Sequence, residues 1–128
     1  MIHRVLLSII TSFAVLAAWG ADNKPEITFA NTSYDLGTIH ASGGTVSATY
    51  TFTNTGTAPL MIISVSNGGC GCTKPSFTKE PIAPGKTGKI TIHFDPSGRR
   101  GELNRKVKVT TNAPGKRKTL TFTGSIIP

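Results

Sequence analysis

The sequence predicts an all-β domain, built as an antiparallel sandwich of short strands. Runs of alternating apolar and polar residues are separated by turns rich in Gly, Pro and Asn, and these turns recur at near-regular spacing. Beyond residue 20, no stretch of ten residues carries the 3.6-residue apolar period of an amphipathic helix. About seven short strands with this spacing are typical of an immunoglobulin-like (Ig-like) β-sandwich.

The first element, residues 1–20, is predicted to be a cleavable secretory signal. A short positive start at residues 1–4 leads into an apolar run at residues 5–18, which is shorter than the roughly 20 apolar residues of a transmembrane helix. Small residues follow, and cleavage is expected after Gly20. An uncleaved N-terminal anchor is the alternative.

Residues 21–128 are then expected to form one Ig-like domain, since this length is ordinary for a single hydrophobic core. The protein is expected to be exported, either periplasmic or secreted, with no membrane span after cleavage. No cysteine lies near the cleavage site, so a lipoprotein anchor is not expected.

The early strands follow from the alternation of side chains. Residues 27–29 and 33–39 predict a broken first strand. From Val46 the pattern is cleanest, because one face is apolar and the other carries Ser and Thr, as in a sheet with one buried and one wet face. The inward residues there are Val46, Ala48, Tyr50 and Phe52. Residues 54–56 are predicted to form a turn, because Asn and Gly favour turn conformations.

Four later strands complete the pattern. Residues 60–66 predict the first, the second ends at Pro96, the third carries Leu103, Val107 and Val109, and residues 119–127 predict the fourth. The residues expected to point inward from the strands beyond residue 88 are Ile90, Ile92, Phe94, Leu103, Val107, Val109, Leu120, Phe122 and Ile126. Arg105 falls on the same apolar face and is expected to lie near its end or to extend its charged head into water.

Cys70-Gly71-Cys72 is the one chemically unusual motif, and it contains both cysteines of the chain. An internal disulfide, a metal-bound pair and free thiols are all open. Residues i and i+2 of a strand share a face, but their Cβ atoms lie too far apart for a relaxed disulfide. A bond there requires a buckled backbone, which Gly71 permits, and such a bond is easily reduced.

We rank a disulfide or free thiols with a local structural role first, metal binding second and redox activity third. Two thiolates suit Cu(I) or half of a zinc shell, but the sequence places no further ligand beside them. His40 and His93 are expected to be exposed strand or loop residues. No other cofactor is predicted, and Lys74 is the only cation close to the cysteines in sequence.

The formal net charge is +8, and the positive residues concentrate late in the chain. Arg105 belongs to this excess. The side chains predicted to contact an anion are Arg99, Arg100, Lys106, Lys108, Lys116, Arg117 and Lys118. Basic strands and turns usually serve solubility and protect sheet edges, and we rank this interpretation above a dedicated anion-binding face. The alternative is that the basic residues bind a protein or an acidic envelope component. Nucleic acid is not expected, because no aromatic residues are interleaved with the cations.

No catalytic constellation is recognised, so an enzyme is not predicted. The sequence has no Gly-x-Ser-x-Gly elbow, and its few carboxylates show no pairing typical of a hydrolase. The favoured function is therefore a noncatalytic binding or structural module of the cell envelope. Metal binding and thiol–disulfide exchange through Cys70 and Cys72 are the alternatives.

Taken together, several motifs give the chain a family resemblance. The tracts are Phe52-Thr53-Asn54-Thr55-Gly56, Pro59-Leu60, Cys70-Gly71-Cys72-Thr73, Pro81-Ile82, Pro84-Gly85 and Phe94-Asp95. Over about residues 29–126 they resemble the bacterial domain-of-unknown-function family 1573, within the broader superfamily of major-sperm-protein and abnormal-spindle-like domains. The resemblance implies an exported Ig-like domain, frequent in Bacteroidetes, without an established activity. Gly69 departs from the family, which more often has Ser there, and this implies a looser loop before Cys70.

Overall fold

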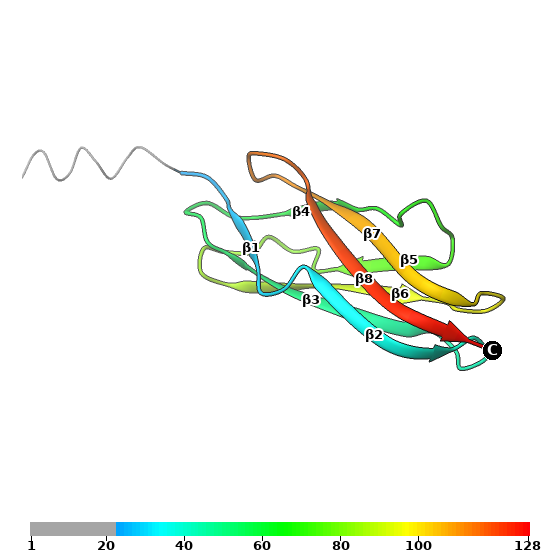
Figure 1. The fold of residues 1–128 in the computed structure, drawn as a ribbon. Coiled ribbons are helices and arrows are strands. Elements are labelled where there is room, and N and C mark those ends of the chain that lie inside the picture. The colour runs from blue at the N-terminus through cyan, green and yellow to red at the C-terminus, as the bar shows by residue number, and fades with distance from the viewer. Residues whose placement is uncertain (1–22) are drawn as a thin grey trace, which may run out of the picture.

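The computed structural model describes residues 23–128, which form eight strands in two packed sheets (Figure 1). The predicted signal at residues 1–20 and its cleavage site lie outside the described residues. Between residues 23 and 128, no helix is long and apolar enough to cross a membrane.

The first sheet has the strand order β1-β3-β6-β5, and every pairing in it is antiparallel. Its strands are β1 (Ile27–Phe29), β3 (Val46–Asn54), β5 (Thr73–Phe77) and β6 (Thr87–Phe94). The long β3–β6 ladder, from Val46 opposite Phe94 to Thr53 opposite Thr87, forms its centre.

The second sheet has the order β2-β8-β7-β4. Its strands are β2 (Ser33–His40), β4 (Ile62–Val65), β7 (Gly101–Thr111) and β8 (Lys118–Ile127). Strands β7 and β8 form an antiparallel hairpin, β4 pairs antiparallel to β7, and β2 pairs parallel to β8.

This arrangement confirms the predicted Ig-like sandwich. The first sheet has the order of strands A, B, E and D of an Ig domain, and β4, β7 and β8 have the positions of strands C, F and G. Two details differ from the prediction: the strands number eight rather than about seven, and the β2–β8 pair is parallel rather than antiparallel.

The parallel pair comes from the N-terminal segment, which also contributes to the larger number of strands. The predicted broken first strand is two strands in opposite sheets. The Ala30 N–H still donates to the Thr51 carbonyl of the first sheet, whereas the Thr32 carbonyl accepts from the Thr121 N–H of the second. The chain therefore changes sheets within two residues and continues in the same direction, so it joins β8 in parallel.

Strand β5 was not predicted. Its sequence contains Pro75, which cannot donate a backbone hydrogen bond and is unfavourable inside a sheet. Because β5 is the outermost strand of its sheet, Pro75 pairs with Ile92 on one side and needs no donor on the other.

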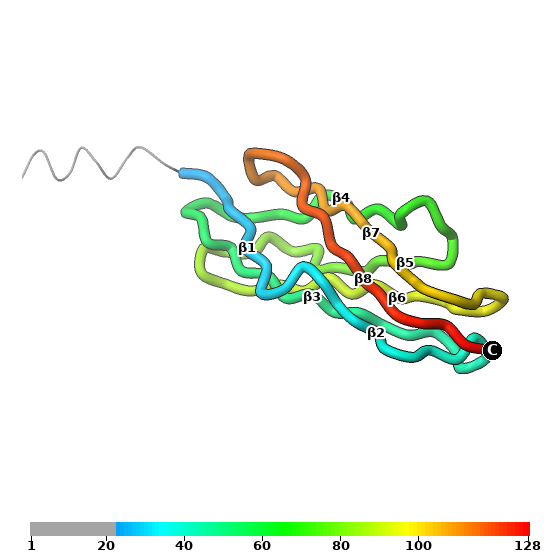
Figure 2. The backbone as a smooth tube through the Cα atoms, viewed as in Figure 1, coloured from blue at the N-terminus to red at the C-terminus, as the bar shows by residue number. Residues whose placement is uncertain are grey.

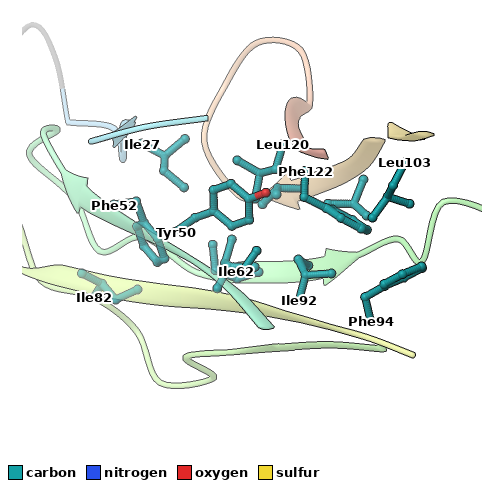
Figure 3. Packing of buried hydrophobic residues seen from close by; sticks show 14 of the residues in the cluster. Ile27, Tyr50, Phe52, Ile62, Ile82, Ile92, Phe94, Leu103, Leu120 and Phe122 are labelled. Atoms are coloured by element: carbon teal, nitrogen blue, oxygen red, sulfur yellow. The ribbon is translucent and has the colours of Figure 1, made fainter. Parts of the chain in front are cut away.

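The core lies between the sheets and contains the residues predicted to point inward (Figure 3). Val46, at the end of its strand, is the one that stays half-buried. Phe94 of β6 and Phe122 of β8 pack across the two layers with ring centroids 5.8 Å apart. The Tyr50 hydroxyl donates to the Thr121 carbonyl at 2.6 Å, and burial raises the pKa of this phenol to about 12. Arg105 is half-buried, which agrees with its predicted position.

Connections gather at the two ends of the sandwich, as the tube in Figure 2 shows. The N-terminal segment, the β3–β4 connection and the β7–β8 hairpin lie at one end, here called the cleft end. The β4–β5 connection and the β6–β7 turn lie at the other, here called the disulfide end.

Candidate functional site

The cleft end is organised by the buried side chain of Asn54, which ends β3. Its Nδ2 donates to the carbonyl oxygens of Ala58 at 2.8 Å and Ile82 at 2.9 Å. Its Oδ1 accepts from the backbone N–H of Gly56 at 2.9 Å and of Glu26 at 3.3 Å. One amide therefore joins the N-terminal segment, the β3–β4 turn and the approach to β6.

Gly56 allows the N-terminal segment to pack against the turn. A Cβ atom at this position would overlap the Lys24 carbonyl oxygen and would lie 2.6 Å from the Glu26 nitrogen. The Thr57 N–H donates to that Lys24 carbonyl at 2.9 Å, and the Thr55 N–H donates to the Glu26 carbonyl at 2.8 Å. The Asn54-Thr55-Gly56 turn is thus a docking site for the start of the domain.

A cleft of about 410 Å³ lies between the N-terminal segment, the β3–β4 turn and the β7–β8 hairpin. Lys24 and three consecutive hairpin residues, Lys116, Arg117 and Lys118, line it. Glu26 is the one carboxylate among its lining residues, and the Thr55 hydroxyl donates to that carboxylate at 2.7 Å. This volume lies within the range of ligand-binding pockets, and the charge of the cleft is positive.

The structure divides the predicted anion-contact residues among three places. Lys116, Arg117 and Lys118 lie at the cleft end, whereas Arg99 and Arg100 lie in the β6–β7 turn at the disulfide end. Lys106 and Lys108 are exposed residues of β7 between the two ends. The 11 residues of β7 rise about 36 Å, so the two ends are too far apart for one compact ligand to contact both.

Sequence reasoning missed Lys24 and Glu26 as parts of the cleft, because they are distant from the hairpin in sequence. The signal that pointed to them was the Asn54-x-Gly56 turn, which was interpreted only as a turn. A Gly in such a turn also marks a close approach of other backbone, and here that backbone is residues 24–26.

Cys70 and Cys72 form a disulfide in the connection between β4 and β5, with 5.2 Å between their Cα atoms. This is one of the three states left open by the sequence. Both cysteines are half-buried, and Cys72 packs against the core. The backbone on either side is anchored, since the Thr73 N–H donates to the Cys70 carbonyl and the Asp95 N–H donates to the Cys72 carbonyl at 2.9 Å.

Two donors point at the sulfur of Cys70. Arg99 Nη2 donates to Cys70 Sγ at 3.1 Å, and the Cys72 backbone N–H donates to the same sulfur at 3.2 Å. Cys72 Sγ contacts only the Thr73 hydroxyl, at 3.7 Å, among the polar contacts found for it. Sequence reasoning did not identify Arg99 here, because 29 positions separate it from Cys70.

Asp95 adds a negative charge near this turn. Hydrogen bonds from the Ser97 backbone N–H and then from its side chain hold the pKa of the Asp95 carboxyl below its usual value, and the charges of Arg99 and Lys74 contribute less. Lys74 itself lies on the exposed face of β5, opposite His93. The cation that contacts the disulfide is therefore Arg99 and not the sequence neighbour.

Within the part of the chain that the structure describes, no group of three or more His, Cys, Asp and Glu residues is arranged to hold a metal ion. His93 is exposed on β6, where Ser47 Oγ lies 3.0 Å from Nδ1 and Ser76 Oγ lies 3.4 Å from Nε2. His40 ends β2 as an exposed residue. The metal hypothesis therefore gains no additional ligand from the fold.

Replacing both Cys70 and Cys72 by Ser is expected to lower the free energy of unfolding by less than about 2 kcal/mol. The disulfide closes a loop of only three residues, for which chain entropy gives about 1.6 kcal/mol. Urea unfolding of the double variant and of reduced wild type, followed by circular dichroism, measures this difference. Loss of the folded state in either sample would contradict the expectation.

The sequence profile of the family described as "Protein of unknown function (DUF1573)" matches residues 27–126. A comparison with curated proteins gives no match. A protein of unknown function from Porphyromonas gingivalis W83 has a similar structure, with a TM-score of 0.69, 20% identity, and coverage of 85% of this chain and 50% of that chain.

Parts of two enzymes also share the fold. The Vibrio cholerae VesB protease matches with a TM-score of 0.57 and 17% identity, over 83% of this chain and 32% of that chain. A family 123 glycoside hydrolase from Clostridium perfringens matches with a TM-score of 0.54 and 10% identity, over 82% and 27%. This chain spans half the length of the P. gingivalis protein and about a third or less of the two enzymes, and the likeness concerns the fold alone.

Proposed function

The chain belongs to the DUF1573 family, and from that premise we propose that it is an exported, noncatalytic Ig-like binding module of the cell envelope. Its ligand is an acidic segment of a partner protein, bound in the cleft beside the β7–β8 hairpin. The observation that carries this proposal is the gathering of Lys24, Lys116, Arg117 and Lys118 around one cleft that has a single carboxylate.

Cleft shape and charge support a peptide ligand. Hydrophobic and small residues, including Ile27, Val109, Ala113 and Pro114, line the cleft together with the cations. Concave sites that combine apolar walls with a few polar groups are typical of ligand binding. The cations attract an acidic chain and the apolar walls contact its side-chain carbons.

The noncatalytic part of the proposal rests on the cleft's own side chains. None of its described lining residues is a His, Cys or Ser, so the Ser–His and Cys–His pairs of nucleophilic catalysis have no members there. Export is proposed from the apolar start of the sequence and the small residues before residue 21.

Replacing Lys116 and Lys118 by Glu in one variant is expected to weaken binding of an Asp- and Glu-rich peptide by at least about tenfold, because two attractive charges become repulsive. The measurement is fluorescence polarisation of the labelled peptide at low and at physiological salt, with a neutral Asn- and Gln-rich peptide for comparison. Both lysines are exposed, so the fold should be unaffected.

A Lys106→Glu, Lys108→Glu variant is the matched control, because it changes net charge equally on the exposed side of β7 at two residues that do not line the cleft. Its peptide affinity is expected to fall by less than about threefold. Equal losses of peptide affinity in the two variants would show that net charge alone causes the effect, and this would contradict the cleft as the binding site. Binding of an acidic polysaccharide, with none of the acidic peptide, would contradict the peptide ligand.

A further inference from the structure

The disulfide end carries a second arrangement that the proposed binding function does not use. Cys70 Sγ lies beside a guanidinium and a backbone N–H, at 3.1 Å and 3.2 Å, whereas Cys72 Sγ has no N–H donor among its hydrogen bonds in the structure. The two sulfurs of one disulfide therefore differ in their ability to hold negative charge.

This difference determines which sulfur leaves when the disulfide is attacked. Thiol–disulfide exchange proceeds by attack of a thiolate on one sulfur and release of the other as a thiolate. Arginine next to a cysteine, and hydrogen bonds to the charged form, stabilise the thiolate. Attack on Cys72 Sγ with release of the Cys70 thiolate is thus the favoured direction.

The backbone around the disulfide is held by hydrogen bonds that do not involve the S–S bond. The loop that the disulfide closes contains three residues and adds little to stability. The loop backbone is held independently, since the Thr73 N–H donates to the Cys70 carbonyl at 3.2 Å and the Asp95 N–H to the Cys72 carbonyl at 2.9 Å. Gly69 N–H also donates to Asn67 Oδ1 at 2.9 Å. The dithiol form can therefore keep Arg99 close to Cys70.

We propose that the Cys70–Cys72 disulfide is an exchange-active site that oxidises a dithiol of an exported protein, with Arg99 stabilising the Cys70 thiolate. A substrate thiolate attacks Cys72 Sγ, a mixed disulfide forms there, and Cys70 leaves as a thiolate beside the Arg99 guanidinium. The second substrate thiolate then attacks the substrate sulfur of the mixed disulfide, and Cys72 leaves and takes up a proton.

The net reaction transfers two electrons from the substrate dithiol to the cysteine pair. The substrate gains a disulfide and gives up two protons, of which one is taken up by Cys72 and the other is released to water while Cys70 remains a thiolate beside Arg99. Because stabilising the reduced form makes a disulfide a stronger oxidant, the Arg99 contact favours this direction. A disulfide of another exported protein returns the pair to its oxidised form by the reverse steps.

The test equilibrates the purified full chain with glutathione redox buffers and counts free thiols by alkylation and intact mass. Arg99→Ala is expected to shift the equilibrium toward the disulfide by about threefold to tenfold, and Arg99→Lys is expected to restore part of the wild-type value. Arg100→Ala is the matched control, because Arg100 is in the same turn, and it should leave the equilibrium unchanged.

Two further measurements locate the chemistry. With limiting iodoacetamide, reduced wild type is expected to be labelled first at Cys70, and Arg99→Ala should slow that labelling. Oxidised wild type should convert a reduced two-cysteine peptide to its disulfide faster than Arg99→Ala does, and Cys70→Ser with Cys72→Ser should not convert it.

Each of three outcomes would overturn the proposal. The disulfide stays oxidised in all the glutathione buffers, or iodoacetamide labels Cys72 before Cys70. The third outcome is the same thiol–disulfide equilibrium for Arg99→Ala and Arg100→Ala. None of these measurements involves the cleft at the other end of the domain. Acidic-peptide binding can therefore fail while the exchange site stands, and the reverse also holds.

Discussion

Replacing Asn54 by Ala is expected to lower the free energy of unfolding by about 3 to 5 kcal/mol. The substitution removes two donors and one acceptor that serve four backbone partners, and it leaves the Ile82 carbonyl with the Leu60 N–H as its remaining donor. A buried polar group without its partner costs about 1 to 3 kcal/mol, and several are affected at once. Urea unfolding followed by far-ultraviolet circular dichroism measures the loss.

Two control variants isolate the cause. Asn112 makes a similar pair of bonds, accepting from the Met61 N–H at 2.8 Å and donating to the Pro59 carbonyl at 3.1 Å, but it is exposed. Asn112→Ala is expected to cost less than about 1 kcal/mol, because water replaces its bonds. Asn54→Asp keeps the acceptor oxygen and loses the donor, so it should be destabilising as well. Similar losses for Asn54→Ala and Asn112→Ala would contradict the role of burial.

Gly56→Ala is expected to lower the free energy of unfolding by about 2 to 4 kcal/mol. The new Cβ would lie within 3 Å of three backbone atoms of residues 24–26, and backbone cannot turn aside as a flexible side chain can. The segment must move, and the bonds that Thr55 and Thr57 make to it are then lost or lengthened. Thermal and urea unfolding of the variant measure the cost.

Gly71→Ala is the matched control for Gly56→Ala, because nothing lies within 4 Å of its Cβ position and its backbone is not left-handed. It is expected to change stability by less than about 0.5 kcal/mol. Gly56→Ala should also weaken acidic-peptide binding, since the segment that it displaces forms one wall of the cleft. A Gly56→Ala variant as stable as Gly71→Ala would show that the N-terminal segment is not docked in solution.

Most strands of the sandwich could be predicted, because the alternation of apolar and polar residues along a strand indicates which side chains face the core. In β3 and β6 every expected inward residue except the terminal Val46 is buried. Alternation does not record which sheet a strand joins, so the change of sheet after Phe29 and the parallel β2–β8 pair were not predictable from it. Strand β5 contains Pro75, and a proline is accepted in a strand at the edge of a sheet. The edge position of β5 is defined only by the order of all the strands in the sheet.

The candidate sites were predicted less completely, because each combines residues that are distant in sequence. The cleft joins Lys24 to a hairpin more than ninety residues later, and the sulfur of Cys70 meets a side chain from the β6–β7 turn. Charge and cysteine content led to the chemistry that is proposed for both places. The packing of the connections at the two ends determines which basic residues lie at each site. The alternation of residues within strands does not indicate how these connections pack.

The parallel pairing of β2 with β8 also determines how the domain bears mechanical load. The described chain starts at one end of the sandwich and finishes at the other (Figure 1). Tension between these ends pulls β2 and β8 in opposite directions along their shared ladder, which runs from Ser33 opposite Thr121 to His40 opposite Ile127. The interstrand bonds are then loaded together in shear and do not open one after another, so the domain is built to resist stretching between its termini.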